Sequence, residues 1–390
     1  MAEWIECKIC DIGTVVGGAT PSTKKAENYE CGNIAWITPK DLSTFNGRYI
    51  QRGERNITEI GLKSCSTQLL PKNTVLFSSR APIGYIAIAA NQVCTNQGFK
   101  SVIPNEATDP LFLFYLLKYN KDKIEAMGSG TTFKEVSGNT MKNIIVRVLS
   151  DKEVQKNIAS ILGTLDNKIE ENERINNNLE QQAKALYKDW FFDFSPFSTK
   201  GNLPDGWHLG TVGDIIQLHD SKRVPLSGSE RDKMEKIYPY YGATSLMDYV
   251  DNYLFDGIYL LLGEDGTVVD SLGFPILQYV YGQFWVNNHA HIITGKEGFS
   301  VEELYLFFSL TNIKSIVTGA VQQKVSQQNL KKVPAIIPSK EALSAFDDLI
   351  QPIFAQIRNL RDENAHLADL RDTLLPRLMS GELDVSDTEI

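Results

Sequence analysis

The chain has 390 residues with a net charge of −9; 42% of them are hydrophobic and 22% are charged. These values are typical of a soluble globular protein, and the length favours two domains, each with its own core. No apolar run could span a bilayer and no basic, apolar leader opens the chain, so we expect a cytoplasmic protein without membrane contact.

Residues 1–150 are predicted to form a first globular domain of mixed strand and helix. Short apolar runs bounded by Gly, Pro and Asn predict strands, for example at Ile34–Ile37 and Tyr85–Ala89. Leucines on one face predict a helix over Pro110–Tyr119, with Asp109 placed to cap it. The run at Asp109 also resembles the Asn/Asp-Pro-Pro-aromatic loop of amino-methyltransferases but lacks its second proline, so we favour capping.

The five cysteines of the chain all lie in this first domain. They are Cys7, Cys10, Cys31, Cys65 and Cys94. An odd number of cysteines in a protein expected to stay in the cell favours reduced thiols. The Cys7-x-x-Cys10 spacing could supply half of a zinc site, but no second pair completes it. We therefore expect no zinc here.

Residues 151–193 are predicted to form a long spacer helix. Its apolar residues recur at helical spacing, which is typical of a coiled-coil seam. The predicted seam residues are Ile158, Leu165, Ile169, Leu179 and Leu186. A turn-rich linker follows over residues 194–206.

The second half of the chain repeats the plan of the first. Residues 207–338 predict a second globular domain with strands at Tyr259–Leu262 and Ala335–Ile337 and a helix at Val301–Leu310. Residues 339–380 predict a second spacer helix, and residues 381–390 an acidic tail. The seam residues of this helix are Ile350, Ile353, Ile357, Leu360, Leu367 and Leu374. Pro352 falls inside it and is expected to kink or break it.

The predicted fold class is therefore α+β, with two similar globular domains joined by two long helices. The approximate twofold symmetry of the repeat favours antiparallel pairing of the helices as a coiled coil that acts as a rigid spacer. The alternative is that each helix docks on its own globular domain.

No catalytic motif is found in the sequence. There is no complete GxGxxG and no phosphate-binding GxxxxGK[ST] loop. His289 and His291 stand two residues apart, a spacing that a metal could use, but no third ligand is evident. Gly263-Glu264-Asp265-Gly266 pairs two carboxylates, yet the first half has Ser78-Ser79-Arg80 at the corresponding place. A metal site shared by both domains is therefore not expected.

The order of motifs resembles the specificity subunits of type I restriction-modification systems along nearly the whole chain. In the first half the resemblance rests on the runs Leu70–Tyr85 and Cys94–Ser101. In the second half it rests on Tyr238–Thr244, Gly263–Gly266 and Trp285–His291.

This resemblance implies two target-recognition domains, each reading half of a split, double-stranded DNA site, and helices that set the gap between the halves. It implies two modification subunits that use S-adenosylmethionine and two motor-nuclease subunits that use ATP and Mg²⁺. This chain is then expected to be non-catalytic and to bind no cofactor itself.

The candidate DNA-contacting residues follow from the positions of these motifs. Lys and Arg would hold phosphates, while amides, arginines and aromatics would read bases in the grooves. In the first domain the candidates are Lys40, Ser78, Arg80, Asn96, Gln97, Thr131 and Lys134. In the second they are Tyr240, Tyr241, Glu264, Asp265, Asn288, His289, Gln323 and Lys324.

Two other functions remain open at this stage. A self-sufficient nuclease or methyltransferase would need a metal or cofactor motif, which the sequence lacks. A coiled-coil scaffold that binds only proteins would explain the helices but not the Lys- and Arg-rich loops of both domains. The net negative charge does not decide between them, because DNA binding depends on local patches rather than on the total.

Overall fold

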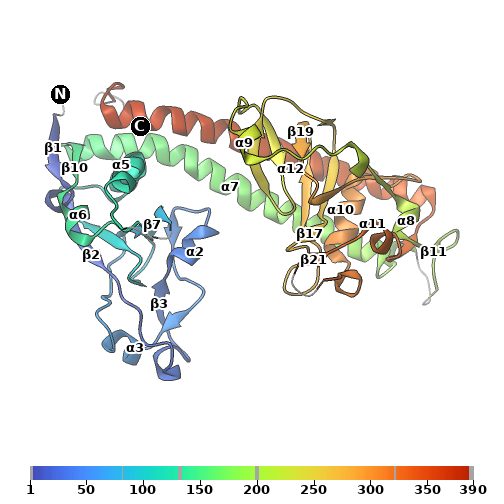
Figure 1. The fold of residues 1–390 in the computed structure, drawn as a ribbon, viewed down its shortest axis with the longest axis horizontal. Helices are drawn as coiled ribbons and strands as arrows, with labels where there is room; N and C mark the ends of the chain where they lie inside the picture. The colour runs from blue at the N-terminus through green and yellow to red at the C-terminus, as the bar shows by residue number, and fades with distance from the viewer. Residues whose placement is uncertain (1–2, 81, 131–133, 198–201, 320–321, 386–390) are drawn as a thin grey trace. The chain divides into compact units, whose positions relative to one another are not determined.

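The computed structural model describes residues 3–80, 82–130, 134–197, 202–319 and 322–385. The chain divides into two compact units (Figure 1). The first comprises Met1–Glu173 and Arg361–Ile390, and the second comprises Arg174–Leu360. Each unit thus combines one globular head with segments of both long helices, whereas the sequence predicted head and helix as successive separate domains.

The first head contains three sheets. Strands β1 (Trp4–Lys8) and β10 (Ile145–Leu149) form an antiparallel pair. The largest sheet has the order β2 (Gly13–Gly17), β9 (Lys100–Pro104), β6 (Val75–Ser79), β7 (Ile83–Ala89) and β4 (Tyr49–Ile50). The third sheet has the order β5 (Asn56–Ile57), β3 (Ile34–Ile37) and β8 (Cys94–Thr95). The strands predicted at Ile34–Ile37 and Tyr85–Ala89 are confirmed as β3 and part of β7.

Short helices cover these sheets. They are α1 (Ile9–Ile12), η1 (Ala26–Asn28), α2 (Pro39–Ser43), α3 (Glu59–Lys63), α4 (Pro110–Tyr119), α5 (Lys121–Ala126) and α6 (Gly138–Asn143). Helix α4 has the predicted bounds, and the Asp109 carboxylate accepts from the N–H groups of Leu111 and Phe112 at 2.9 Å each. Asp109 is therefore a helix cap, as the sequence favoured.

The second head repeats this arrangement of sheets. The terminal pair is β11 (His208–Thr211) with β22 (Pro334–Ile337). The main sheet has the order β12 (Ile216–Leu218), β20 (Ala290–Gly295), β16 (Tyr259–Gly263) and β18 (Leu277–Val280). The other large sheet has the order β14 (Leu246–Val250), β13 (Tyr238–Tyr241), β19 (Gln283–Val286) and β15 (Phe255–Asp256). A small pair joins β17 (Asp265–Gly266) to β21 (Gln323–Lys324).

Short helices also occur in the linker and in the second head. They are η2 (Ser195–Phe197), α8 (Val212–Ile215), η3 (Asp220–Lys222), α9 (Gly228–Arg231), α10 (Val301–Leu310), η4 (Lys314–Ile316) and α11 (Gln327–Leu330). In strand order, β12, β20, β16 and β18 correspond to β2, β9, β6 and β7. Each head also contains one equivalent parallel strand pair, which is β3 with β8 in the first head and β13 with β19 in the second. The predicted internal repeat is confirmed at the level of topology.

The two long helices contribute to both units. Helix α7 spans Lys152–Phe191 and α12 spans Lys340–Ser380 without a break at Pro352, so the predicted break there is wrong. Within the first unit, the Asn172 amide donates to Asn364 Oδ1 at 2.8 Å, and Asp166 pairs with Arg371 at 2.7 Å. Residue numbers fall along α7 as they rise along α12. The segments are therefore antiparallel here, as predicted.

The predicted seam is buried, but it is only part of the contact that the helices make. Among its residues, Ile158, Ile350, Ile357 and Leu360 are buried, and Leu165, Ile169, Leu179, Leu186, Ile353, Leu367 and Leu374 are partly buried. Further buried helix residues include Leu162, Ala183, Tyr187 and Phe354, and Phe346 of the predicted apolar pattern is also buried. All of these side chains except Leu165, Ile169, Leu360 and Leu367 belong to an apolar cluster that they share with head residues of the same unit. Helix pairing and docking on the head therefore occur together.

Glu303 on α10 is a carboxyl group buried in the second unit. Its Oε2 accepts from the Ser300 N–H at 2.8 Å, and its Oε1 has no partner among the described residues. Burial, with Asp347 on α12 and Glu302 nearby, raises the pKa of Glu303 to about 8, against the lowering effect of the Ser300 bond. The folded protein therefore keeps a proton that the unfolded chain releases above about pH 4.3.

Glu303→Gln is expected to remove one source of pH-dependent stability. In the wild type the free energy of unfolding should fall as the pH rises from about 4.3 to 8, because only the folded state binds this proton there. The variant should melt at a higher temperature than the wild type at pH 8, and the difference should shrink towards pH 5. Equal differences in melting temperature at both pH values, measured by circular dichroism, would contradict this.

None of the helices in the described ranges is long and apolar enough to cross a membrane.

Candidate nucleic-acid interface

Three chain segments meet at one end of the main sheet in the first head. They are the end of β6, the turn at Asn96–Gly98 and the segment that precedes α6. The Ser79 N–H donates to the Gly98 carbonyl at 2.7 Å, and the Val136 N–H donates to the Ser79 carbonyl at 2.9 Å. These backbone bonds bring together predicted site residues that are up to 56 positions apart in the sequence.

The second head contains the same junction. The Glu264 N–H donates to the His289 carbonyl at 2.8 Å, and the Val325 N–H donates to the Glu264 carbonyl at 2.8 Å. Ser79 therefore corresponds to Glu264, and Val136 to Val325. Asp265 pairs with Lys324 across β17 and β21. The six predicted residues between Glu264 and Lys324 thus lie around one junction.

The turns of the two junctions share one amide that holds the backbone. Asn96 Oδ1 accepts from the Gly98 N–H at 2.9 Å, and Asn287 Oδ1 accepts from the His289 N–H at 2.8 Å. The side-chain oxygen of Asn96 therefore shapes the turn, and a contact of Asn96 with DNA stays a prediction. The next residue in each turn, Gln97 or Asn288, is exposed. Gln97 Oε1 accepts from the Thr20 hydroxyl.

The charge of the first junction centres on one carboxylate. Glu135 pairs with Arg80 at 3.7 Å and with Lys100 at 3.3 Å. Lys134 is exposed beside it. Two cations on one anion leave a local positive excess, which suits a phosphate backbone.

The second junction is built around a largely buried ion-pair cluster that contains Arg223. Arg223 Nη1 donates to Glu264 Oε2 at 2.6 Å and to the Ala290 carbonyl at 2.8 Å. His291, which is fully buried, contacts Asp220 Oδ2 through Nδ1 at 2.6 Å and the Val325 carbonyl through Nε2 at 2.8 Å. These bonds tie β16, β20 and the segment before α11 together.

Opposite charges keep both carboxylates of this cluster ionised. Burial alone would raise the pKa of Asp220, but the bonds from His291 and from the Ile292 N–H hold that pKa below its ordinary value. Burial would likewise raise the pKa of Glu264, and Arg223 with His291 lowers it overall. Both groups therefore favour the folded state above about pH 4, and this contribution is lost as the pH falls below that value.

Asp220, Glu264 and His291 are the one group of potential metal ligands that converges among the described residues. Both ring nitrogens of His291 are already engaged, and Arg223 binds Glu264. A cation would have to displace that arginine, so these residues fit an internal ion-pair network better than a metal site. His289 contacts a different carboxylate, Asp265, at 2.6 Å, so the two histidines do not converge on one ligand.

Two of the residues predicted to contact DNA have buried side chains that are used within the fold. Ser78 Oγ donates to the Pro82 carbonyl and accepts from the Tyr85 N–H, both at 2.8 Å, and holds the turn between β6 and β7. The Tyr240 hydroxyl accepts from the Leu226 N–H at 3.0 Å. Tyr241 is partly buried against Phe284, and Thr131 lies outside the described residues.

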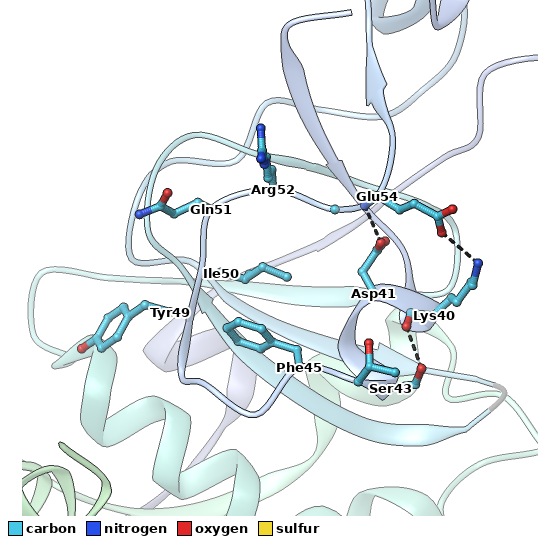
Figure 2. Close-up of a pocket in the computed structure, with 11 residues that line it drawn as sticks. Lys40, Asp41, Ser43, Phe45, Tyr49, Ile50, Gln51, Arg52 and Glu54 are labelled. Atoms are coloured by element: carbon cyan, nitrogen blue, oxygen red, sulfur yellow. Dashed lines mark hydrogen bonds and ion pairs between the residues drawn. The ribbon is translucent and has the colours of Figure 1, made fainter. Parts of the chain in front are cut away.

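The remaining predicted contacts stay at the surface. Lys40 is exposed on α2 and pairs with Glu54 at 2.8 Å (Figure 2). Lys324 is also exposed and pairs with Glu264 at 3.4 Å, while Gln323 is partly exposed.

The sequence interpretation missed Arg223, Asp220 and Glu135 as parts of the junctions. Asp220 lies 71 residues before its partner His291, so no local motif connects them. Arg223 stands in a basic run beside Lys222, and this run was its only signal in the sequence.

The chain is similar to known proteins over most of its length. The family described as "Type I restriction modification DNA specificity domain" matches residues 1–181 and 204–365. The chain is 34% identical to the type I restriction enzyme MjaIX specificity subunit of Methanocaldococcus jannaschii, over 99% of this chain and 94% of that protein. It is 23% identical to the EcoprrI specificity subunit of Escherichia coli, over 90% and 89% respectively.

A solved structure shares the fold. The S subunit of a type I restriction-modification system from M. genitalium superposes with a TM-score of 0.58 and 18% identity, over 97% of this chain and 96% of that one.

Proposed function

Because the chain belongs to the type I restriction-modification DNA specificity family, we propose that it is the subunit that recognises a split, asymmetric DNA sequence for such a complex. It addresses the complex to DNA and performs no chemistry itself. Each head reads one half of the site, and the paired helices set the gap between the halves.

One observation carries this proposal most directly: the two junctions share a backbone but differ in side-chain chemistry. Arg80 and Glu135 of the first head are replaced by Asp265 and Lys324 at the equivalent cross-strand positions of the second, so that the charges are exchanged. Scaffold positions do not need such a change. Two similar frames with different reading groups suit two different half-sites.

The partners follow from this role. We propose that modification subunits bring S-adenosylmethionine and methylate adenine, and that motor-nuclease subunits use ATP and Mg²⁺, with two copies of each per specificity subunit. The chain itself is proposed to hold no cofactor. Its own contribution is the positioning of two DNA segments, with Lys and Arg on phosphates and loop side chains on base edges.

Lys134→Ala is expected to weaken binding of the assembled complex to cognate and unrelated DNA by similar factors. Lys134 is exposed and has no ion-pair partner among the described residues. The loss of one phosphate contact should reduce the steepness of log K against log salt by about one. Fluorescence anisotropy over a salt series measures both quantities.

Lys63→Ala is the matched control, because Lys63 is exposed on α3, away from the junction residues. It should leave affinity and salt slope unchanged. If Lys134→Ala behaved like this control, the junction of the first head would not lie against the DNA backbone.

A further inference from the structure

A hollow in the first head lies along strands β3 and β5, beside the segment that precedes β8. It has a volume of about 370 Å³, and its polar lining consists of Asn33, Gln51, Arg52, Asn56 and Asn91. Asn33 directly precedes β3, and Asn56 pairs with Ala35 across β3 and β5. Gln51 adjoins Ile50, whose carbonyl accepts from the Ala90 N–H at 2.9 Å. The hollow is therefore assembled from four separate chain segments.

The side chains of this hollow are chemically ready for a polar ligand. Four amides and one guanidinium can donate, and the amides can also accept. Gln51 and Arg52 are exposed, and neither has a side-chain hydrogen bond or ion pair to a described residue. The Oδ1 atom of Asn56 is buried without a hydrogen-bond partner within the described part of the chain.

The backbone holds these side chains in place. A Cβ atom at Gly53 would lie 2.7 Å from the Trp36 carbonyl oxygen, so the segment after Arg52 is packed directly against β3. The Glu54 N–H donates to Asp41 Oδ1 at 2.7 Å, and Ile50 is buried before Gln51. Arg52 therefore projects from a stretch anchored on both sides and points away from Phe45 (Figure 2).

The second head supplies an internal comparison for this surface. The Ile37 carbonyl accepts from the Asn96 N–H, and the Tyr241 carbonyl accepts from the N–H of the equivalent Asn287. Ile37 on β3 therefore corresponds to Tyr241 on β13, and the residues before them correspond one by one. Strand pairing then matches Asn33 with Ile237 and Asn56 with Tyr249.

Burial separates the matched positions into two classes. Buried positions keep a similar character: Trp36 corresponds to Tyr240, and Ile57 to Val250. The surface positions differ, since Ile237 is 53% and Tyr249 42% exposed where the first head has asparagines. The frame is kept while the surface changes, which is the pattern of a reading surface.

We propose that this hollow reads base edges in the half-site bound by the first head, with Arg52 as a specificity-determining residue. Arginine binds guanine O6 and N7 with two parallel hydrogen bonds, and Asn or Gln binds adenine N6 and N7. The ligand is double-stranded DNA, and the inference rests on the proposed function. It adds a second contact region to the junction around Arg80 and Lys134.

The test uses the full chain, co-expressed with the modification subunit of its own complex. Arg52→Ala should make one position in one half of the methylated motif degenerate and leave the other half unchanged. Affinity for the cognate duplex should fall about 10- to 100-fold, with little change for unrelated DNA. Arg52→Lys keeps the charge but lacks the planar fork, so it should give the same degenerate motif.

Lys8→Ala, which removes an exposed charge from β1, in a different sheet from the strands of the hollow, is the control and should change neither quantity. Base reading by this hollow would be overturned if Arg52→Ala left the methylated motif unchanged. It would also be overturned if Arg52→Ala weakened binding to all DNA sequences equally and Arg52→Lys restored that affinity in full. In both cases the split motif of the wild type would still stand. If the wild-type complex itself showed no split motif, the proposed function and this inference would both fail.

A second variant combines Asn33→Ala with Asn91→Ala and keeps Arg52. It should lose base specificity at one position in the same half of the motif. An unchanged motif would show that these two amides do not read bases.

Discussion

Replacing Arg223 by alanine is expected to lower the free energy of unfolding of the second head by about 3–5 kcal/mol. The side chain is only 13% exposed and pairs with Glu264 at 2.6 Å. It also donates to the Asp220 carbonyl at 3.0 Å and the Ala290 carbonyl at 2.8 Å. Alanine would leave the largely buried Glu264 carboxylate with the exposed Lys324 as its remaining lysine or arginine partner, and would remove one donor from each of the two carbonyls. The junction that carries His289 would lose its support.

Urea denaturation followed by circular dichroism measures this loss. Lys222→Ala removes the same charge from the adjacent exposed position and should stay within about 0.5 kcal/mol of the wild type. The Arg223 variant should also methylate the split site more weakly, because the second head would read its half of the site less well. The control should methylate the site as the wild type does. A stability equal to that of the control would show that the cluster around Glu264 does not depend on Arg223.

Phe346→Ala is expected to have an effect of similar size on the second unit, about 3–5 kcal/mol. Phe346 on α12 is fully buried, and its ring centroid lies 4.8 Å from that of Phe191 and 5.6 Å from that of Tyr187, both on α7. Trp190 also contacts it at 5.4 Å. The substitution opens a cavity where the two helices and the head share one apolar cluster.

Leu349→Ala on the same helix is the matched control, because Leu349 is 47% exposed. Its unfolding free energy should change far less than that of Phe346→Ala. Similar losses for the two variants in urea titrations would mean that the cluster does not hold α12 against α7 in this unit.

Local patterns predicted much of the fold, and the reason is visible in particular residues. Residues 136–144 and 325–333 have similar sequences, and each segment begins with a serine cap: Ser137 accepts from the Thr140 N–H and Ser326 from the Asn329 N–H. Each cap satisfies donors within three residues, so the signal is contained in a short stretch of sequence.

The features that the sequence did not reveal depend on contacts across the fold. Ser78 and Tyr240 lie in short apolar strands, where the sequence does not show that both faces are covered. The network of Asp220, Arg223 and His291 joins segments about 70 residues apart. The hollow around Arg52 exists only once β3, β5 and β7 are in register, so its asparagines carried no signal in the sequence.

The proposed role of this chain is to address a type I complex to one split DNA sequence. The most direct test is a map of adenine methylation in host genomic DNA by long-read sequencing, with the gene present and deleted. We expect methylation to disappear at one motif of two short defined halves around a fixed unspecified gap. An unchanged map in cells that express the modification subunit would contradict the account.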